Sequence, residues 1–203
     1  MIKKLNKKEI YKASTVLADA FQDDPLWNKL FEGEEDLEVK FRNFFDVPLR
    51  FCMKYGEVWS TSDEYEGVAA WVPGKLSYMT FWRMIQSGSI IPAMKMGSKI
   101  GKTMQKAFAS VDTDRKSSMK GKNFIYLFVI GVSTKNQGRG FGGKLINPLL
   151  EHADKNGLYV YLETETEANV RLYERIGFKT IKKIDLPVFE LPFWEMAREP
   201  KER

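Results

Sequence analysis

Cysteine and histidine are nearly missing from this 203-residue sequence, which has one of each, Cys52 and His152. A single cysteine cannot form an internal disulfide, and this favours a reducing compartment such as the cytoplasm. Nothing close to Cys52 along the chain would activate its thiol, so the sequence gives no support to a cysteine nucleophile. No metal site is predicted.

Long apolar runs are also missing. None approaches the ~20 residues needed to cross a bilayer, and no hydrophobic region follows the basic residues 1–8, as a secretory signal would require. We therefore expect a cytoplasmic protein with no membrane partner. The 14 Phe, eight Tyr and five Trp supply ample core area and exclude wholesale disorder.

Positive charge is concentrated in one segment. The chain has a net charge of +5, whereas residues 95–122 hold eight basic and two acidic residues, a net +6. The concentration of positive charge in one segment argues against a general nucleic-acid-binding surface. The segment is either a solvated helix face with a flexible loop or a site that attracts a polyanion.

Apolar spacing predicts the secondary structure of the first half. The predicted strands are 2–5, 57–61 and 67–72, and the predicted helices are 8–21, 25–31 and 37–53. Residues 77–108 are rich in Met and are expected to form two helices split near Pro92, followed by a polar loop over 109–122.

The second half alternates strand and helix over 124–132, 141–153, 158–163 and 168–175, which is a βαβα unit with a parallel strand pair. Two more strands, 179–184 and 188–196, follow, and Pro148 predicts a kinked helix. We expect one α/β domain over 1–203. Its sheet should be mixed and mostly antiparallel, with six or seven strands flanked by helices and a helical insertion at about 77–122.

The glycine-rich segment 137–145 lies between the buried strand and the next helix, a junction that favours anion binding. Three phosphate-binding motifs compete for it. A P-loop would need Ser or Thr after Lys144, where Leu145 stands. A dinucleotide fingerprint would use Gly138, Gly140 and Gly143 with Glu163, but five residues separate the strand from the first glycine, and too little chain follows for a doubly wound sheet.

The third motif, Gln137-x-x-Gly140-x-Gly142, resembles the acetyl-CoA loop of the GCN5-related N-acetyltransferase (GNAT) superfamily. The segment 169–178, Asn-Val-Arg-Leu-Tyr-Glu-Arg-Ile-Gly-Phe, is similar to a second motif of that family. The resemblance runs from Phe124 to about Leu186. It implies the acyl-CoA N-acyltransferase fold, acetyl-CoA as co-substrate and an amine as acceptor, with small-molecule acetyltransferases as the nearest subgroup.

The resemblance also implies which residues bind acetyl-CoA. The pantetheine would pair with the strand end Ile130-Gly131-Val132, although plain packing also accounts for Gly131. The pyrophosphate would lie on the backbone amides of 138–143. The full set is Ile130, Gly131, Val132, Gln137, Gly138, Arg139, Gly140, Phe141, Gly142, Gly143, Lys144, Asn169 and Tyr173. Asn169 stands four residues before the tyrosine, where a helix cap is the alternative, and segment 95–122 is a further candidate for the 3′-phosphate.

Catalysis needs a base for the protonated amine and an acid for the leaving thiolate. By resemblance Tyr173 is the acid. Glu163 is our choice of base, and Glu165, on the same side of the strand, is the alternative.

The acceptor should bind between the N-terminal helices and the Met-rich insertion, with Asp23 or Asp24 attracting its charge. Candidate wall residues are Trp27, Phe31, Trp71, Trp82 and Met84. We expect a small-molecule amine and no nucleic-acid partner, and a homodimer stays open. A non-catalytic acyl-CoA sensor and a nucleic-acid-binding module are the alternatives from other classes.

Overall fold

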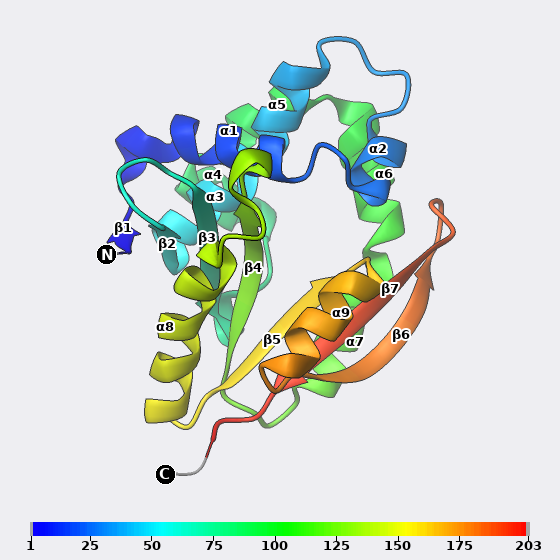
Figure 1. The fold of residues 1–203 in the computed structure, drawn as a ribbon. Coiled ribbons are helices and arrows are strands. Elements are labelled where there is room, and N and C mark those ends of the chain that lie inside the picture. The colour runs from blue at the N-terminus through cyan, green and yellow to red at the C-terminus, as the bar shows by residue number, and fades with distance from the viewer. Residues whose placement is uncertain (1, 202–203) are drawn as a thin grey trace.

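A computed structural model describes residues 2–201 and has a central sheet of seven strands. The strands are β1 (Lys3–Lys4), β2 (Glu57–Ser60), β3 (Gly67–Pro73), β4 (Phe124–Val132), β5 (Tyr159–Thr164), β6 (Lys179–Leu186) and β7 (Leu191–Arg198). Their order is β1-β2-β3-β4-β5-β7-β6, and only β4 and β5 run parallel (Figure 1). The predicted mixed, mostly antiparallel sheet is confirmed.

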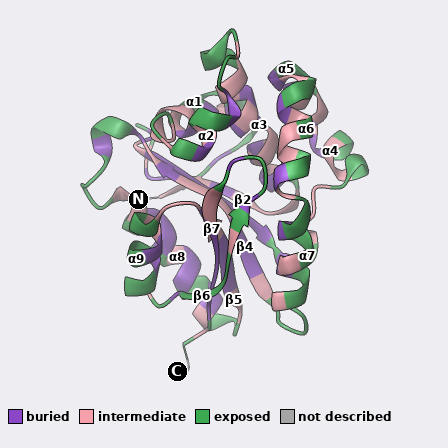
Figure 2. Ribbon diagram, turned by 90° about the vertical axis from the view of Figure 1, so that its right-hand side faces the viewer, coloured by how far each residue is buried: buried purple, intermediate pink, exposed green. Residues whose placement is uncertain are grey.

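Helices cover both faces of the sheet. They are α1 (Ile10–Ala20), α2 (Pro25–Leu30), α3 (Leu37–Tyr55), α4 (Phe81–Ser87), α5 (Ile90–Met96), α6 (Ser98–Ala107), α7 (Ala109–Ser118), α8 (Phe141–Lys155) and α9 (Glu167–Arg175). On one face α1 and α3 pack against the strands, and α4 and α5 pack on α3. On the other face lie α8 and α9. Helices α2, α6 and α7 pack together beside the turn that joins β6 and β7. Figure 2 shows that the helices have exposed outer sides.

The insertion differs from its prediction. Residues 77–108 form three helices rather than two, because the chain turns at Gly88 and Gly97, both at positive φ. Pro92 lies in the first turn of α5, where an intrahelical N–H is not needed. The predicted loop 109–122 is also wrong, because its first ten residues form α7.

Prolines interrupt the other elements less than expected. Helix α8 continues through Pro148, and its predicted kink stays a prediction. The last strand begins at Leu191 instead of 188, because Val188 and Glu190 adopt positive φ in a turn. Pro192 pairs with β6 only, because the β7 residues that pair with β5 begin at Trp194. The missing N–H of Pro192 therefore breaks no hydrogen bond to β5.

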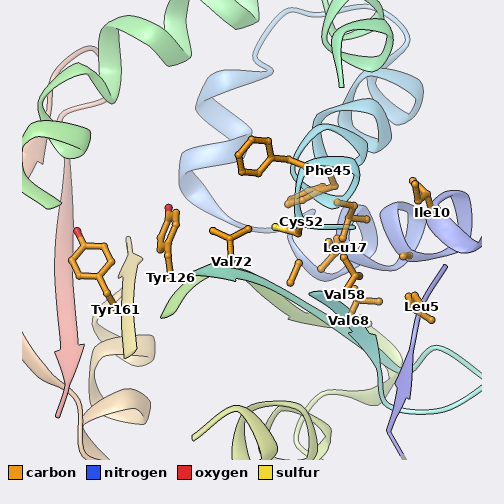
Figure 3. Close-up of a cluster of buried hydrophobic side chains, with 14 of the residues drawn as sticks. Leu5, Ile10, Leu17, Phe45, Cys52, Val58, Val68, Val72, Tyr126 and Tyr161 are labelled. Carbon is orange, nitrogen blue, oxygen red and sulfur yellow. The ribbon is translucent and has the colours of Figure 1, made fainter. Parts of the chain in front are cut away.

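The main core lies between the sheet and helices α1 and α3, where Leu17, Phe45, Val58 and Val68 pack around Cys52 (Figure 3). Burial raises the pKa of the Cys52 thiol. The thiol therefore stays protonated, in agreement with the expectation that it is not a nucleophile.

Gly131 lets α1 pack closely on β4. A Cβ at this position would lie 2.9 Å from Leu17 Cδ2 and 3.0 Å from both Ala20 Cβ and Phe21 Cε2. These contacts are tighter than van der Waals packing allows, so helix packing explains the glycine.

Gly131→Ala should therefore destabilise the fold by about 1–3 kcal/mol, the usual cost of overpacking a core. Gly101→Ala is the matched control, because Gly101 lies inside α6 with no atom within 4 Å of its would-be Cβ. That variant should gain about 0.5–1 kcal/mol from helix propensity. Urea unfolding measures both, and equal effects at the two sites would contradict this account.

Candidate active site

The parallel strands β4 and β5 separate toward their C-terminal ends (Figure 1). They pair only where residues 124–126 of β4 face residues 159–161 of β5, whereas β4 stays paired with β3 up to Val132. The rest of β4 therefore presents free backbone groups on its β5 side. A cavity of about 990 Å³ opens in this gap and extends to both faces of the sheet.

The glycine loop forms one wall of the cavity. Gly138 and Gly140 have φ of +74° and +80°, and Gly140 is the N-cap of α8. A Cβ on either would meet no atom within 4 Å, so space is open beside the loop. Asp19 of α1 holds the loop start by accepting hydrogen bonds from Thr134 N (2.8 Å) and Thr134 Oγ1 (3.0 Å). Free amides at a helix N-terminus beside open space make an anion-binding site.

Most of the predicted binding residues meet at this cavity. Those that line it are Ile130, Gly131, Val132, Gln137, Gly138, Gly140, Phe141, Gly142, Gly143, Asn169 and Tyr173. Asn169 lies within the first turn of α9. The N-cap of this helix is Thr166, whose Oγ1 accepts a hydrogen bond from Asn169 N at 3.3 Å. The alternative that Asn169 caps the helix is therefore wrong.

Arg139 and Lys144 lie beside the loop but are not part of the cavity lining. The Arg139 guanidinium donates to Asn136 Oδ1 at 2.7 Å. Both cations stack on the Phe141 ring, at 5.5 and 4.5 Å from its centroid. Their charge adds to the positive potential around the loop.

Tyr173 reaches the cavity from α9, on the face opposite α1 and α3. It is 8% exposed and packs against Phe178, with ring centroids 5.5 Å apart. Burial, with a smaller effect of the Glu165 charge, raises the pKa of the Tyr173 phenol. The hydroxyl therefore carries its proton at neutral pH, as a general acid must.

Glu163 lies at the cavity in a buried polar cluster. Its Oε1 pairs with Arg115 Nη1 at 2.8 Å, and its Oε2 accepts from Tyr126 Oη at 2.6 Å. Tyr126 and Tyr161 project side by side from β4 and β5 (Figure 3). Burial raises the pKa of Glu163, against the lowering effect of Arg115 and the tyrosine.

Glu165 and Asp24 bring two carboxyl groups together where β5 ends. Burial raises the pKa of Glu165 well above its usual range, and the adjoining Asp24 carboxyl raises it further. Both residues line the cavity. A half-buried carboxyl with a raised pKa is a candidate to exchange a proton with a substrate amine.

The raised Glu165 pKa makes stability depend on pH. A folded-state pKa above the unfolded value means that the folded protein binds more protons than the unfolded chain. The contribution of Glu165 to the free energy of unfolding is therefore lost as pH rises from about 4.3. Relative to wild type, Glu165→Gln should gain stability with rising pH, with a slope of at most about 1.4 kcal/mol per pH unit. Urea unfolding of both proteins from pH 5 to 8 tests this, and a constant difference would contradict the assignment.

Only one of the five predicted wall residues, Trp27, lines the cavity. Trp71 points to the α8 side of the sheet, where it stacks on Trp59 with ring centroids 6.2 Å apart. Phe31 is buried against Phe41 in the cluster below α2. Trp82 lies on α4, 72% exposed, and Met84 follows on the same helix. Trp82 and Met84 are outside the lining because α4 packs on α3, away from the strand gap.

The sequence missed Arg115, which was counted with a solvated basic segment. It is 3% exposed and is the only basic residue of 95–122 among those lining the cavity. Helices α6 and α7 lie across the strand gap from the glycine loop (Figure 1), so this segment is not placed to hold a phosphate near that loop. One sequence signal for a buried helix face was available, because Val111, Arg115 and Met119 recur every fourth residue. In the structure all three are buried.

Two kinds of feature are absent from residues 2–201. No cluster of three or more His, Cys, Asp or Glu side chains in this range could hold a metal ion. No helix there is both long and apolar enough to span a membrane.

Comparisons with known proteins agree on one family. Residues 53–178 match the model of the acetyltransferase (GNAT) family. An uncharacterised N-acetyltransferase of Schizosaccharomyces pombe is 28% identical over 206 residues, covering 98% of this chain and 83% of the relative.

Solved structures share the fold. One from Corynebacterium glutamicum, described as "histone acetyltransferase HPA2 and related acetyltransferase", has a TM-score of 0.66 and 19% identity and covers 100% of this chain and 97% of its own. A polyamine N-acetyltransferase of Drosophila melanogaster that forms N-acetylagmatine has a TM-score of 0.63 and 14% identity, with 98% and 99% of the two chains covered.

Proposed function

Because this chain belongs to the GNAT acetyltransferase family, we propose that it transfers the acetyl group of acetyl-CoA to the primary amine of a small-molecule acceptor. The observation that carries the proposal is the shared cavity. It joins the glycine loop, the free edge of β4, the Tyr173 hydroxyl and two candidate bases in one continuous space.

The residues present fit acetyl-CoA. The amides of 138–143 at the N-terminus of α8 suit a pyrophosphate, and the positive φ at Gly138 and Gly140 keeps side chains out of its way. The free edge of β4 at 130–132 suits the amides of pantetheine. Gln137, Phe141 and Asn169 complete the lining, and Arg139 and Lys144 add charge beside it.

In the proposed reaction, the amine nitrogen attacks the thioester carbonyl carbon. A C–N bond forms and the C–S bond breaks, giving the N-acetyl amine and CoA. Tyr173 donates its proton to the leaving thiolate. Glu163 is the proposed base, directly or through water, and Glu165 beside Asp24 is the alternative, with the more strongly raised pKa.

The Drosophila neighbour, whose product is N-acetylagmatine, acetylates a small amine, and this supports a small-molecule acceptor here. The cavity supports the same choice, because it is a lined pocket between the N-terminal helices and the insertion.

Calorimetric titration with acetyl-CoA, CoA and NAD in one buffer tests the cofactor assignment. We expect binding of acetyl-CoA and CoA and no binding of NAD. Failure to bind either CoA compound would overturn the proposal. Binding of acetyl-CoA without transfer to any amine would favour the sensor alternative.

A further inference from the structure

A second cavity lies at the end of α1 that is farther from the glycine loop. It has a volume of about 310 Å³ and is lined by residues of α1, α3 and α5. Helices α1 and α5 both pack on α3 (Figure 1). Tyr11 lines this cavity and precedes Asp19, which holds the glycine loop, by about 12 Å along the helix. No described residue lines both cavities, so the second one is separate from the proposed acetyl-CoA site.

Positive charge from three distant parts of the sequence meets in the second cavity. Its basic lining residues are Lys7, Lys8, Arg42, Arg50 and Lys95. Among the described residues of the lining, Asp46 is the one carboxylate, so the lining has a net charge of +4. Glu9, which follows Lys8 along the chain, is not in the lining and pairs with Lys3 at 2.7 Å.

The two arginines are held in place and keep free donors. Arg50 Nε donates to Asp46 Oδ1 at 2.8 Å and Arg50 Nη2 donates to Oδ2 at 3.4 Å, which leaves Nη1 unbound to this carboxylate. The guanidinium carbon of Arg42 lies 4.6 Å from the centroid of the Tyr11 ring. Guanidinium groups bind phosphoryl oxygens through paired N–H donors, so both side chains suit such a ligand.

The other cations of the lining have no carboxylate partner. Within residues 2–201, the ion pairs include none formed by Lys7, Lys8, Arg42 or Lys95. Each phosphoryl group carries a charge of about −1.5 to −2 near neutral pH, so two of them would balance the lining. Beside these cations, Ile91 and Met94 of α5 are 64% and 76% exposed, which also leaves an apolar surface next to the cavity.

We infer that the second cavity is a binding site for a ligand with two phosphoryl groups, or for phosphoryl headgroups presented side by side. The cations neutralise the ligand, and the two ordered arginines fix its oxygens. The inference goes beyond the acetyltransferase reaction and does not depend on it. It also gives a role to the basic start of the chain and to Lys95, the first residue of the basic segment 95–122.

Inorganic pyrophosphate is the soluble probe. Because the glycine loop is itself proposed to hold a pyrophosphate, the titration uses Gly140→Asp protein, in which an added negative charge blocks that loop. If this variant does not fold, wild-type protein saturated with CoA takes its place. In about 0.15 M NaCl, where attraction between exposed charges is screened beyond about 8 Å, calorimetry should give a Kd below about 1 mM.

A pair of lysine substitutions locates the site. Adding Lys8→Gln and Lys95→Gln should raise the Kd for pyrophosphate at least about tenfold, because both residues are proposed to make charge-assisted hydrogen bonds. Lys120→Gln with Lys155→Gln is the matched control, since both lysines are exposed and neither lines a cavity. It removes the same charge and should leave the Kd within about twofold of its value without these changes.

Vesicles separate the two sources of phosphoryl groups. Phosphatidylcholine vesicles with and without phosphatidic acid are sedimented with wild-type protein and with the two lysine pairs. Pyrophosphate binding without sedimentation supports a soluble ligand. Sedimentation that needs phosphatidic acid and is lost in Lys8→Gln with Lys95→Gln supports a lipid headgroup. Absence of both, or binding that survives in this pair or falls equally in the control pair, would overturn the inference.

Discussion

Gly140→Asp should abolish detectable acetyl-CoA binding, with Kd raised at least about 100-fold, or about 2.7 kcal/mol. Gly140 is the N-cap of α8 at φ +80°, and it lines the cavity. An aspartate there places a negative charge where the pyrophosphate is proposed to lie. Calorimetric titration measures the loss.

The control for this variant is Gly157→Asp. Gly157 has φ +63°, follows α8 at its other end, and has no atom within 4 Å of a would-be Cβ. The backbone strain is of the same kind, about 1–2 kcal/mol, but the site lies outside the cavity lining. Acetyl-CoA binding should survive in Gly157→Asp. Equal loss in both variants would show a folding defect and contradict the loop assignment.

Tyr173→Phe should lower kcat by at least about 100-fold while leaving the Kd for acetyl-CoA nearly unchanged, because a general acid contributes about 10²–10⁴-fold. The substitution removes one oxygen from a side chain packed against Phe178, so the fold should hold. Initial rates of thiol release and calorimetry on the same preparation separate the two effects.

Tyr159→Phe is the matched control, because Tyr159 begins β5 at the paired end of the strand gap, outside the cavity. Its activity should equal that of wild type. Full activity in Tyr173→Phe would remove the tyrosine from the reaction. If cellular function also remained, the sensor alternative would gain support.

The glycine loop and Tyr173 could be predicted because the two motifs that carry the family resemblance are short and local. Gly138 and Gly140 adopt positive φ, a backbone conformation that glycine takes without steric cost. The segment containing Tyr173 has a helical pattern that follows a strand directly, so its position relative to the loop follows from the βαβα order. These features depend on neighbours along the chain.

The insertion side of the cavity could not be predicted in the same way. Arg115 meets Glu163 across 48 positions of sequence, and this contact depends on how α7 packs against the sheet. A polar segment such as 109–118 gives a weak helix signal, because its inward stripe includes an arginine. Trp82 shows the converse error: a large aromatic suggests a wall, but α4 leaves it exposed.

The most direct measurement of the central claim is product analysis after incubating the protein with acetyl-CoA and each member of a panel of small primary amines. The account predicts, for at least one of them, the N-acetyl amine and free CoA in equal amounts, both lost in Gly140→Asp. Free CoA without the acetylated amine, or equal product from Gly140→Asp and wild type, would contradict acetyl transfer at this cavity.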